Sequence, residues 1–296
     1  MARVALIGAN GQLGTDISRL WADSALGKRG DDLISLTHAD IEVTDPAFVR
    51  SVLTGVQPSI VINTAAYHNV DECESNPLEA FEVNALGVKY VAEVCRDLNA
   101  TLVQFSNDCV FDGTKGTPYI EDDALGPISA YGISEAAGER FLRYMLPDDH
   151  LLVRSVGLYG VAGASGKGGN FVETMLRLCR EGRPIRVVDD QITSPTYTLD
   201  LADVLLEVIA RDVRGTLHIT SAGQCSWYEF ATEIFSLLGV HPDFAAISTA
   251  EAMDAAPRPA YSVLDNSRLE SLGLEQPRDW REALMDYLKL KGRLAA

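Results

Sequence analysis

The segment Val4-Ala-Leu-Ile-Gly8-Ala-Asn-Gly11-Gln-Leu-Gly14 decides the fold of this chain. Its four apolar residues form a run of strand length, and three glycines spaced three residues apart follow directly. Such a turn lets backbone approach a pyrophosphate, and the helix that it opens directs its N-terminus at negative charge. The segment therefore predicts a dinucleotide-binding turn between the first strand and the first helix.

The alternation of strand and helix continues through the first half of the chain. Further apolar runs of strand length occupy 33–36, 60–63, 102–105 and 151–154, and helical patterns occupy 12–21, 46–53, 77–99 and 130–144. Unbroken apolar runs suit strands buried on both faces, and their alternation with helices indicates βαβ units. We predict an α/β fold with a doubly wound, Rossmann-type parallel sheet.

The second half has a less regular pattern, which begins at a glycine-rich stretch, 163–169. Helices are expected at 170–180, 199–210, 227–238 and 278–290. We expect a dinucleotide-binding domain at 1–162, with a returning segment at about 199–214. A smaller C-terminal α/β substrate lobe would then comprise 163–198 and 215–296.

Composition narrows the classes of function. Of 296 residues, 47% are hydrophobic and 23% are charged, as in soluble globular proteins. The formal net charge of −17 opposes the phosphate backbone, so we expect no nucleic-acid partner. The five cysteines are widely spaced without a CxxC pair, which indicates reduced thiols and no metal site. Without a signal-like start or an apolar run of about 18 residues, we expect a cytoplasmic protein with no membrane partner.

The end of the second apolar run bears on the choice of cofactor. NAD-selective proteins place an acid there, on the ribose 2′-hydroxyl. This chain instead has Thr37 and His38, with Asp40 slightly later. The pattern favours NADP over NAD, although a surface loop explains His38 equally well.

Longer motifs, in order along nearly the whole chain, carry a family resemblance. They are GANGQLG at 8–14, NTAAY at 63–67, VDECESNP at 70–77, VNALG at 83–87, VFDG at 110–113, YGISE at 131–135, GGNFVETMLRL at 168–178, DQITSPTY at 190–197, CSWYEF at 225–230 and RPAYSVLDNSRL at 258–269. On these motifs the chain resembles the extended short-chain dehydrogenases/reductases and, within them, the dTDP-4-dehydrorhamnose reductases.

The resemblance implies hydride transfer from NADPH or NADH to the 4-keto carbon of a nucleotide-linked deoxysugar, with a tyrosine protonating the alkoxide. The implied catalytic residues are Ser106, Asn107, Tyr131 and Glu135. The implied cofactor-binding residues are Gly8, Asn10, Gly11, Gln12, Leu13, Gly14, His38, Asp40, Ile41, Ala65, Ala66, Tyr67, Tyr131 and Glu135. The implied substrate-binding residues are Val70, Asp71, Asp108, Asn170, Phe171, Gln191 and Arg258. Lys167 is a further candidate for phosphate.

Several positions depart from the pattern of the family that the chain resembles. Asn107 stands where threonine is usual, Cys109 where an aromatic is usual, Gly157 where tryptophan is common, and Glu135 at the lysine of Tyr-x-x-x-Lys. Two unit charges about 5 Å apart interact by about 3 kcal/mol at an effective dielectric of ~20. We therefore expect the Glu135 carboxylate to raise the pKa of Tyr131 and to slow proton transfer.

The sequence is also compatible with other functions and with structural roles for two of these residues. Glu135 and Asn107 favour a catalytically impaired homologue that binds the dinucleotide and has a regulatory or binding role. An epimerase or dehydratase of the same fold is weaker, because the C-terminal motifs follow the reductases. A packing role for Tyr131 and a surface position for Arg258 are the structural alternatives, and the sequence leaves room for a homodimer.

Overall fold

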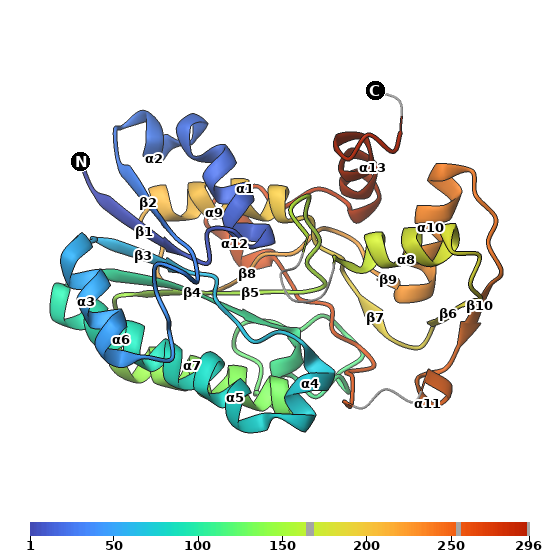
Figure 1. Cartoon of the computed structure of the whole chain (residues 1–296), viewed down its shortest axis with the longest axis horizontal. Helices are drawn as coiled ribbons and strands as arrows, with labels where there is room; N and C mark the ends of the chain where they lie inside the picture. The colour runs from blue at the N-terminus through green and yellow to red at the C-terminus, as the bar shows by residue number, and fades with distance from the viewer. Residues whose placement is uncertain (164–168, 253–255, 295–296) are drawn as a thin grey trace.

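The main body of the protein is a parallel sheet with helices on both faces. The computed structural model describes residues 1–163, 169–252 and 256–294. The sheet has six strands in the order β2-β1-β3-β4-β5-β8 (Figure 1). Their bounds are β1 Arg3–Ile7, β2 Asp32–Leu36, β3 Ile60–Asn63, β4 Thr101–Asn107, β5 His150–Ser155 and β8 Gly215–His218. This order, in which β1 lies between β2 and β3, is that of a doubly wound sheet.

Helices cover the sheet in two layers, each with its own apolar core. On one face, Leu13 and Ile17 of α1 pack with Leu205 of α9 against the strands. On the other face, side chains of α3, α6 and α7 bury the second core (Figure 1). The helices of this body are α1 Gln12–Leu20, α2 Ala25–Lys28, α3 Pro46–Val56, α4 Val70–Ser75, α5 Pro77–Phe81, α6 Val88–Leu98, α7 Ala130–Met145, α9 Thr198–Ala210 and α12 Ser267–Ser271, with short helical turns at η1 Trp21–Asp23 and η3 Asp108–Val110.

A smaller α/β part lies beyond the carboxyl ends of the sheet strands (Figure 1). In it β6 and β10 pair in parallel, and β7 and β9 pair antiparallel. Its core is rich in aromatic rings, among them Tyr159, Phe230 and Trp280. Its elements are α8 Phe171–Arg180, β6 Ile185–Val188, β7 Ile192–Thr193, β9 Cys225–Ser226, α10 Trp227–Leu238, β10 Phe244–Ile247, α11 Thr249–Ala252 and α13 Trp280–Leu290.

The α/β class and the parallel sheet are confirmed, while several element bounds differ. The helix predicted over 77–99 is three segments, because a π-helical stretch, η2 Glu82–Gly87, separates α5 from α6. Elements that were not predicted are the short helices α2, α4, α11 and α12 and the strands β6, β7, β8, β9 and β10. Strand β8 pairs with β5, and Leu269 of α12 packs in the core shared by α1 and α9, so 215–218 and 267–271 belong with the large sheet, where the sequence had assigned both to the small lobe. The remaining domain bounds stay a prediction.

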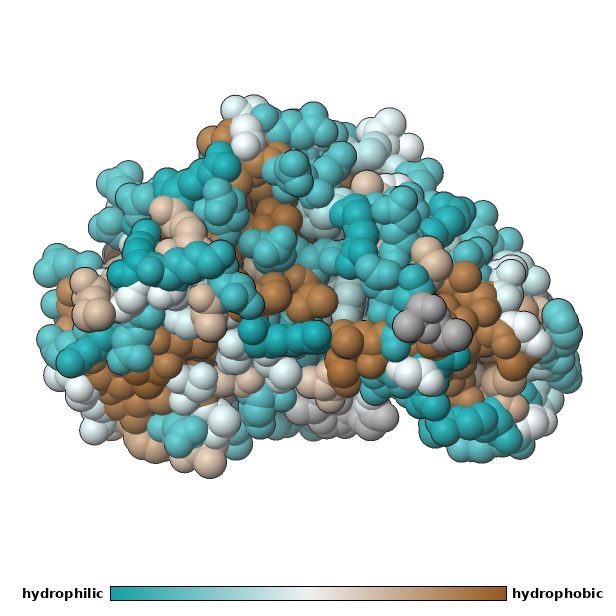
Figure 2. Space-filling view, turned by 90° about the horizontal axis from the view of Figure 1, so that it is seen from above, coloured by the Kyte–Doolittle hydropathy of each residue, from teal (hydrophilic) through white to brown (hydrophobic). Residues whose placement is uncertain are grey.

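The surface has a mixed character on the face turned toward the viewer in Figure 2. Hydrophobic residues there form several separate groups among hydrophilic ones. Within the described ranges, no helix is both long enough and apolar enough to cross a membrane.

Candidate active site

A large cleft joins the carboxyl ends of the sheet strands to the smaller part of the molecule. Its volume is about 1560 Å³, and its lining runs from the β1–α1 turn through the ends of β4 and β5 to α8 and α10. Typical pockets for one small ligand measure about 300–1,000 Å³. The cleft therefore has room for two ligands side by side, as a cofactor and a substrate require.

The glycine turn forms one end of this cleft. Gly8, Asn10, Gly11, Gln12 and Leu13 all line it. Helix α1 begins after Gly11 without a side-chain cap, which leaves its first backbone N–H groups available to an anion beside the lining residues Gln12 and Leu13. These features fit a pyrophosphate, as the sequence predicted.

Two glycines of the turn hold the strand and the helix together. A Cβ on Gly8, whose φ is +80°, would lie 2.4 Å from Thr64 Oγ1. A Cβ on Gly14 would lie 2.3 Å from the carbonyl oxygen of Gly8. Gly14 does not line the cleft, so its part is to let α1 pack on the turn.

The residues after β2 lie at the same end of the cleft. His38 and Ile41 line it, whereas Asp40 does not. The Asp40 carboxylate accepts hydrogen bonds from the backbone N–H and hydroxyl of Thr37, at 2.9 and 2.7 Å. His38 Nε2 lies 3.3 Å from Glu42 Oε2. The Asp40 carboxylate therefore bonds within its own turn, and the acidic residue that lines the cleft here is Glu42.

The loop after β3 supplies the next wall. Ala65, Ala66 and Tyr67 line the cleft. Asn84, from the π-helical stretch, accepts from the Tyr67 backbone N–H at 2.8 Å and donates to its carbonyl at 3.0 Å. The same amide donates to Ser134 Oγ at 3.0 Å and so joins this loop to α7. Sequence reasoning gave Asn84 no role, although it lies within the VNALG motif.

Helix α7 carries Tyr131 into the cleft. Ser129 caps the helix by accepting from the Gly132 N–H at 3.2 Å, which puts Tyr131 in the first turn. A Cβ on Gly132 would lie 2.1 Å from the Cys109 carbonyl oxygen, and a Cβ on Gly138 equally close to that of Asn84. These contacts with backbone on both sides fix where the helix lies.

Asn107, at the end of β4, contacts the tyrosine hydroxyl. Its Oδ1 accepts from the Cys109 backbone N–H at 2.9 Å. Its Nδ2 donates to the Tyr131 hydroxyl, also at 2.9 Å. The structure therefore brings the predicted pair Asn107 and Tyr131 together.

Glu135 lies one turn after Tyr131 and is 6% exposed. Its carboxyl is within hydrogen-bonding reach of the Tyr131 hydroxyl, and burial raises the pKa of Glu135 to about 8. Burial, followed by the charge of Glu135, also holds the pKa of Tyr131 well above its ordinary value. The predicted direction for Tyr131 is correct. The assumed full negative charge is not, because Glu135 is largely neutral at neutral pH.

Ser106 belongs to a buried polar network behind the cleft. Its hydroxyl donates to Glu139 Oε1 at 2.7 Å. Arg154 holds both oxygens of the same carboxylate at 2.7 Å, and both charged side chains are 1% exposed. Ser106 lines the cleft, but its hydroxyl donates into this ion pair rather than to Tyr131.

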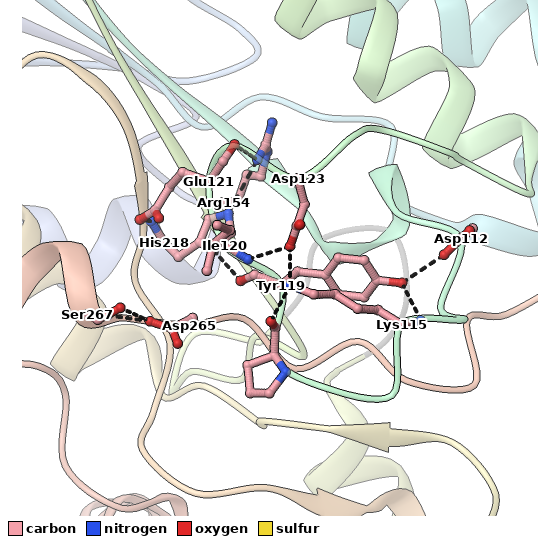
Figure 3. A network of polar contacts seen from close by, with 11 residues as sticks. Asp112, Lys115, Tyr119, Ile120, Glu121, Asp123, Arg154, His218, Asp265 and Ser267 are labelled. Carbon is pink, nitrogen blue, oxygen red and sulfur yellow. Dashed lines mark hydrogen bonds and ion pairs between the residues drawn. The ribbon is translucent and has the colours of Figure 1, made fainter.

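Arg154 continues the network toward the loop that follows η3 (Figure 3). It donates to the Glu121 carbonyl at 3.2 Å and lies 3.3 Å from His218 Nε2. Burial, and then the charge of Arg154, lower the pKa of His218 to about 3, so this imidazole is neutral and can accept from the guanidinium. The network fixes β5, β8 and the 119–123 loop around α7.

The far end of the cleft contains Arg258 and two acids. Arg258 pairs with Asp71 at 2.9 Å, and Asp71 also accepts from the Ala256 N–H at 3.0 Å. Burial raises the pKa of Asp108 to about 6, while a hydrogen bond with Ser262 and the charge of Arg258 lower it. Val70, Asp71, Asp108 and Arg258, which were predicted to bind substrate, all line the cleft. Arg186 is a further arginine of the described lining.

Other predicted substrate residues line the cleft with their polar groups already engaged. Asn170 caps α8 and donates to the Gly160 carbonyl at 3.0 Å. Gln191 donates to Thr249 Oγ1 at 3.0 Å. Phe171 packs against Trp227, with ring centroids 4.7 Å apart and ring planes tilted by 44°. Lys167 lies outside the described residues.

Trp227 is a lining residue that the sequence analysis missed. A Cβ on Gly157 would lie 3.3 Å from Trp227 Cη2, so this ring reaches the wall beside Gly157. The motif CSWYEF contained the tryptophan, but nothing local showed that it faces Gly157. Among the residues that the structure describes, no cluster of three or more His, Cys, Asp or Glu side chains fits a metal ion.

Comparison with known proteins gives the family. The chain is 39% identical to the spore coat polysaccharide biosynthesis protein SpsK of Bacillus subtilis over 98% of each chain. It is 41% identical to a dTDP-4-dehydrorhamnose reductase of Streptomyces griseus, over 94% of this chain and 90% of that one. The crystal structure of dTDP-4-dehydrorhamnose reductase from Bacillus anthracis in complex with NADP matches with a TM-score of 0.90 and 36% identity, over 98% and 99% of the two chains. The family described as RmlD substrate binding domain matches residues 2–292, and this chain belongs to it.

Proposed function

We propose that this protein reduces the 4-keto group of a nucleotide-linked deoxysugar with NADPH or NADH. The observation that carries the proposal is the Asn107–Tyr131 hydrogen bond of 2.9 Å in a cleft whose ends differ in chemistry. One end has the backbone donors of the glycine turn, and the other has Arg258. Relatives named dTDP-4-dehydrorhamnose reductase and dTDP-4-keto-6-deoxy-D-glucose reductase, 41% and 36% identical, support the reaction class.

The proposed division of labour follows the cleft. The dinucleotide would lie against Gly8–Leu13, the β2 end and Ala65–Tyr67, which leaves its nicotinamide near Tyr131. The bound reduced nicotinamide supplies the hydride. Tyr131 then donates its hydroxyl proton to the new alkoxide, and the amide of Asn107 orients that hydroxyl. The relative solved with NADP supports such a cofactor.

The substrate side is the second half of the proposal. Arg258 offers a planar fork of donors that suits a diphosphate, and it now pairs with Asp71. A bound diphosphate would compete with Asp71 for the guanidinium. Phe171 and Trp227 provide an apolar wall for a sugar ring or base.

Turnover of a dTDP-linked 4-keto-6-deoxysugar, followed by the loss of NADPH or NADH absorbance, tests the proposal. We expect Tyr131→Phe to lower kcat by about 100-fold, because general acid catalysis contributes on that order. Tyr144→Phe is the matched control, since Tyr144 is on the same helix and 82% exposed. A parent protein that binds cofactor but oxidises none with this substrate would contradict the proposal.

That last outcome would favour the second candidate, a homologue that binds the dinucleotide and serves a regulatory or binding role. Glu135 at the lysine position is the observation in its favour. A homodimer and the absence of a nucleic-acid partner stay predictions.

A further inference from the structure

The hydrogen bonds around Tyr131 have a defined direction. Asn107 Oδ1 is occupied by the Cys109 N–H, so the side that faces Tyr131 must be the Nδ2 donor. A hydroxyl that accepts from Asn107 keeps its own hydrogen for another acceptor. That acceptor is either a ligand oxygen in the cleft or the carboxyl of Glu135.

Glu135 is the group that completes this arrangement. It lines the cleft and lies on the same helix face as Tyr131, one turn further on. The next carboxylate along the helix, Glu139, is engaged by Arg154 at 2.7 Å and by Arg143 at 3.5 Å. Within the described part of the chain no lysine or arginine pairs with Glu135. The titratable groups that act on Glu135 are Tyr131 and Glu139, while Cys109 and Asp108 act on Tyr131.

We propose that the Glu135 carboxyl, one helical turn after Tyr131 at the cleft wall, supplies the proton that Tyr131 passes to the product oxygen. This inference rests on the proposed function. In the step, hydride from the reduced nicotinamide bonds to the keto carbon, and the carbonyl π electrons become an alkoxide lone pair. The Tyr131 O–H bond breaks as the alkoxide gains that proton. The Glu135 O–H bond breaks in turn as its proton restores Tyr131, which leaves Glu135 as a carboxylate.

The energetics of the relay follow from the surroundings of the two groups. Burial raises the pKa of Glu135 to about 8 and that of Tyr131 well above its ordinary value. Transfer from the carboxyl to a tyrosinate is therefore downhill. Because Glu135 lines the cleft, water can reprotonate it once product leaves.

The relay predicts that kcat falls as pH rises, because Glu135 must carry its proton. A carboxyl that had to be ionised would give the opposite dependence. Glu135 delivers a proton only when it is neutral, below about pH 8. Above that value the competent fraction, and with it kcat, falls about tenfold for each pH unit.

The test compares kcat against pH for the parent protein, Glu135→Gln and a control, Glu93→Gln. Glu93 is a helical glutamate paired with Lys89, outside the cleft lining. Glutamine can donate a hydrogen bond to Tyr131 but cannot release a proton. We expect Glu135→Gln to lower kcat at neutral pH by at least about tenfold, to change KM for the sugar by less than kcat, and to abolish the decline near pH 8. Glu93→Gln keeps the parent profile.

A second readout is independent of turnover. Infrared difference spectra of the protein without ligands, recorded across the pH range, should contain a carboxylic-acid carbonyl band that titrates near pH 8. The band should be present in Glu93→Gln and missing from Glu135→Gln. A Glu135→Gln protein with the parent kcat and pH profile, or a Glu135 already ionised at neutral pH, would overturn the relay alone. No reduction by the parent protein would overturn the proposed function and the relay together.

Discussion

Glu135 and Glu139 lie one turn apart on the same helix, and both are buried, at 6% and 1% exposure. Glu139 has Arg154 on both oxygens and the Ser106 hydroxyl as a further donor. Glu135 instead has the Tyr131 hydroxyl as its neighbour and lines the cleft. The comparison teaches that burial does not by itself decide what a carboxyl does, because one of the two is paired with a buried guanidinium while the other, without a cation, is pushed toward its neutral form.

The largest effect that can test the difference between Glu135 and Glu139 is the dependence of the free energy of unfolding on pH. The pKa of Glu135 is about 8 in the folded protein against an ordinary 4.5. Because the folded value is higher, the stabilisation is fully present below about pH 4.5 and is lost as pH rises to about 8. At about 1.4 kcal/mol per unit, the loss over this range is on the order of 5 kcal/mol.

Urea unfolding of the parent and of Glu135→Gln at a series of pH values measures this loss. The difference in free energy of unfolding should shift in favour of the glutamine variant as pH rises, and level off above about pH 8. Parallel curves for the two proteins would mean that burial does not hold Glu135 in its neutral form.

The next largest effect is on the free energy of unfolding and concerns Glu139 and its partner Arg154. Arg154→Ala leaves Glu139 buried without its cation and should destabilise the protein by about 3–5 kcal/mol. Arg211→Ala, which removes an exposed pair with Glu207, should cost no more than about 1 kcal/mol. Both are measured by urea unfolding at neutral pH. Equal losses in the two variants would show that the buried network is not what distinguishes Glu139.

The smallest expected effect is on kcat and concerns Asn107, which contacts the Tyr131 hydroxyl. Asn107→Ala removes the donor to Tyr131, a bond worth about 1 kcal/mol, so kcat should fall about fivefold. Asn107→Thr, which keeps a hydroxyl donor, should lose less. Steady-state kinetics under saturating cofactor provide the measurement. A rise in KM alone would mean that Asn107 acts on substrate binding rather than on the tyrosine.

Local sequence patterns predicted the parts of the fold that depend on local chemistry. The strand, glycine turn and helix at 4–20 follow from apolar runs and glycine spacing, so they were found. Strand β6 has only four residues with alternating burial, which is too short a signal beside its neighbours. The sequence motifs pointed to the residues that line the cleft, but not to their protonation or to their hydrogen-bond partners. The protonation of Glu135 and the commitment of Ser106 to Glu139 depend on burial and on partners distant in sequence.

The position of α7 is set by Gly132 and Gly138, where backbone from Cys109 and Asn84 leaves no space for a Cβ. Neither contact involves the side chain at 135, which lies between them. Residue 135 can therefore change its chemistry without moving Tyr131, and lysine and glutamate codons differ at a single nucleotide. Evolution could in this way exchange one mode of proton supply for another in a single mutation while the architecture stayed as it was.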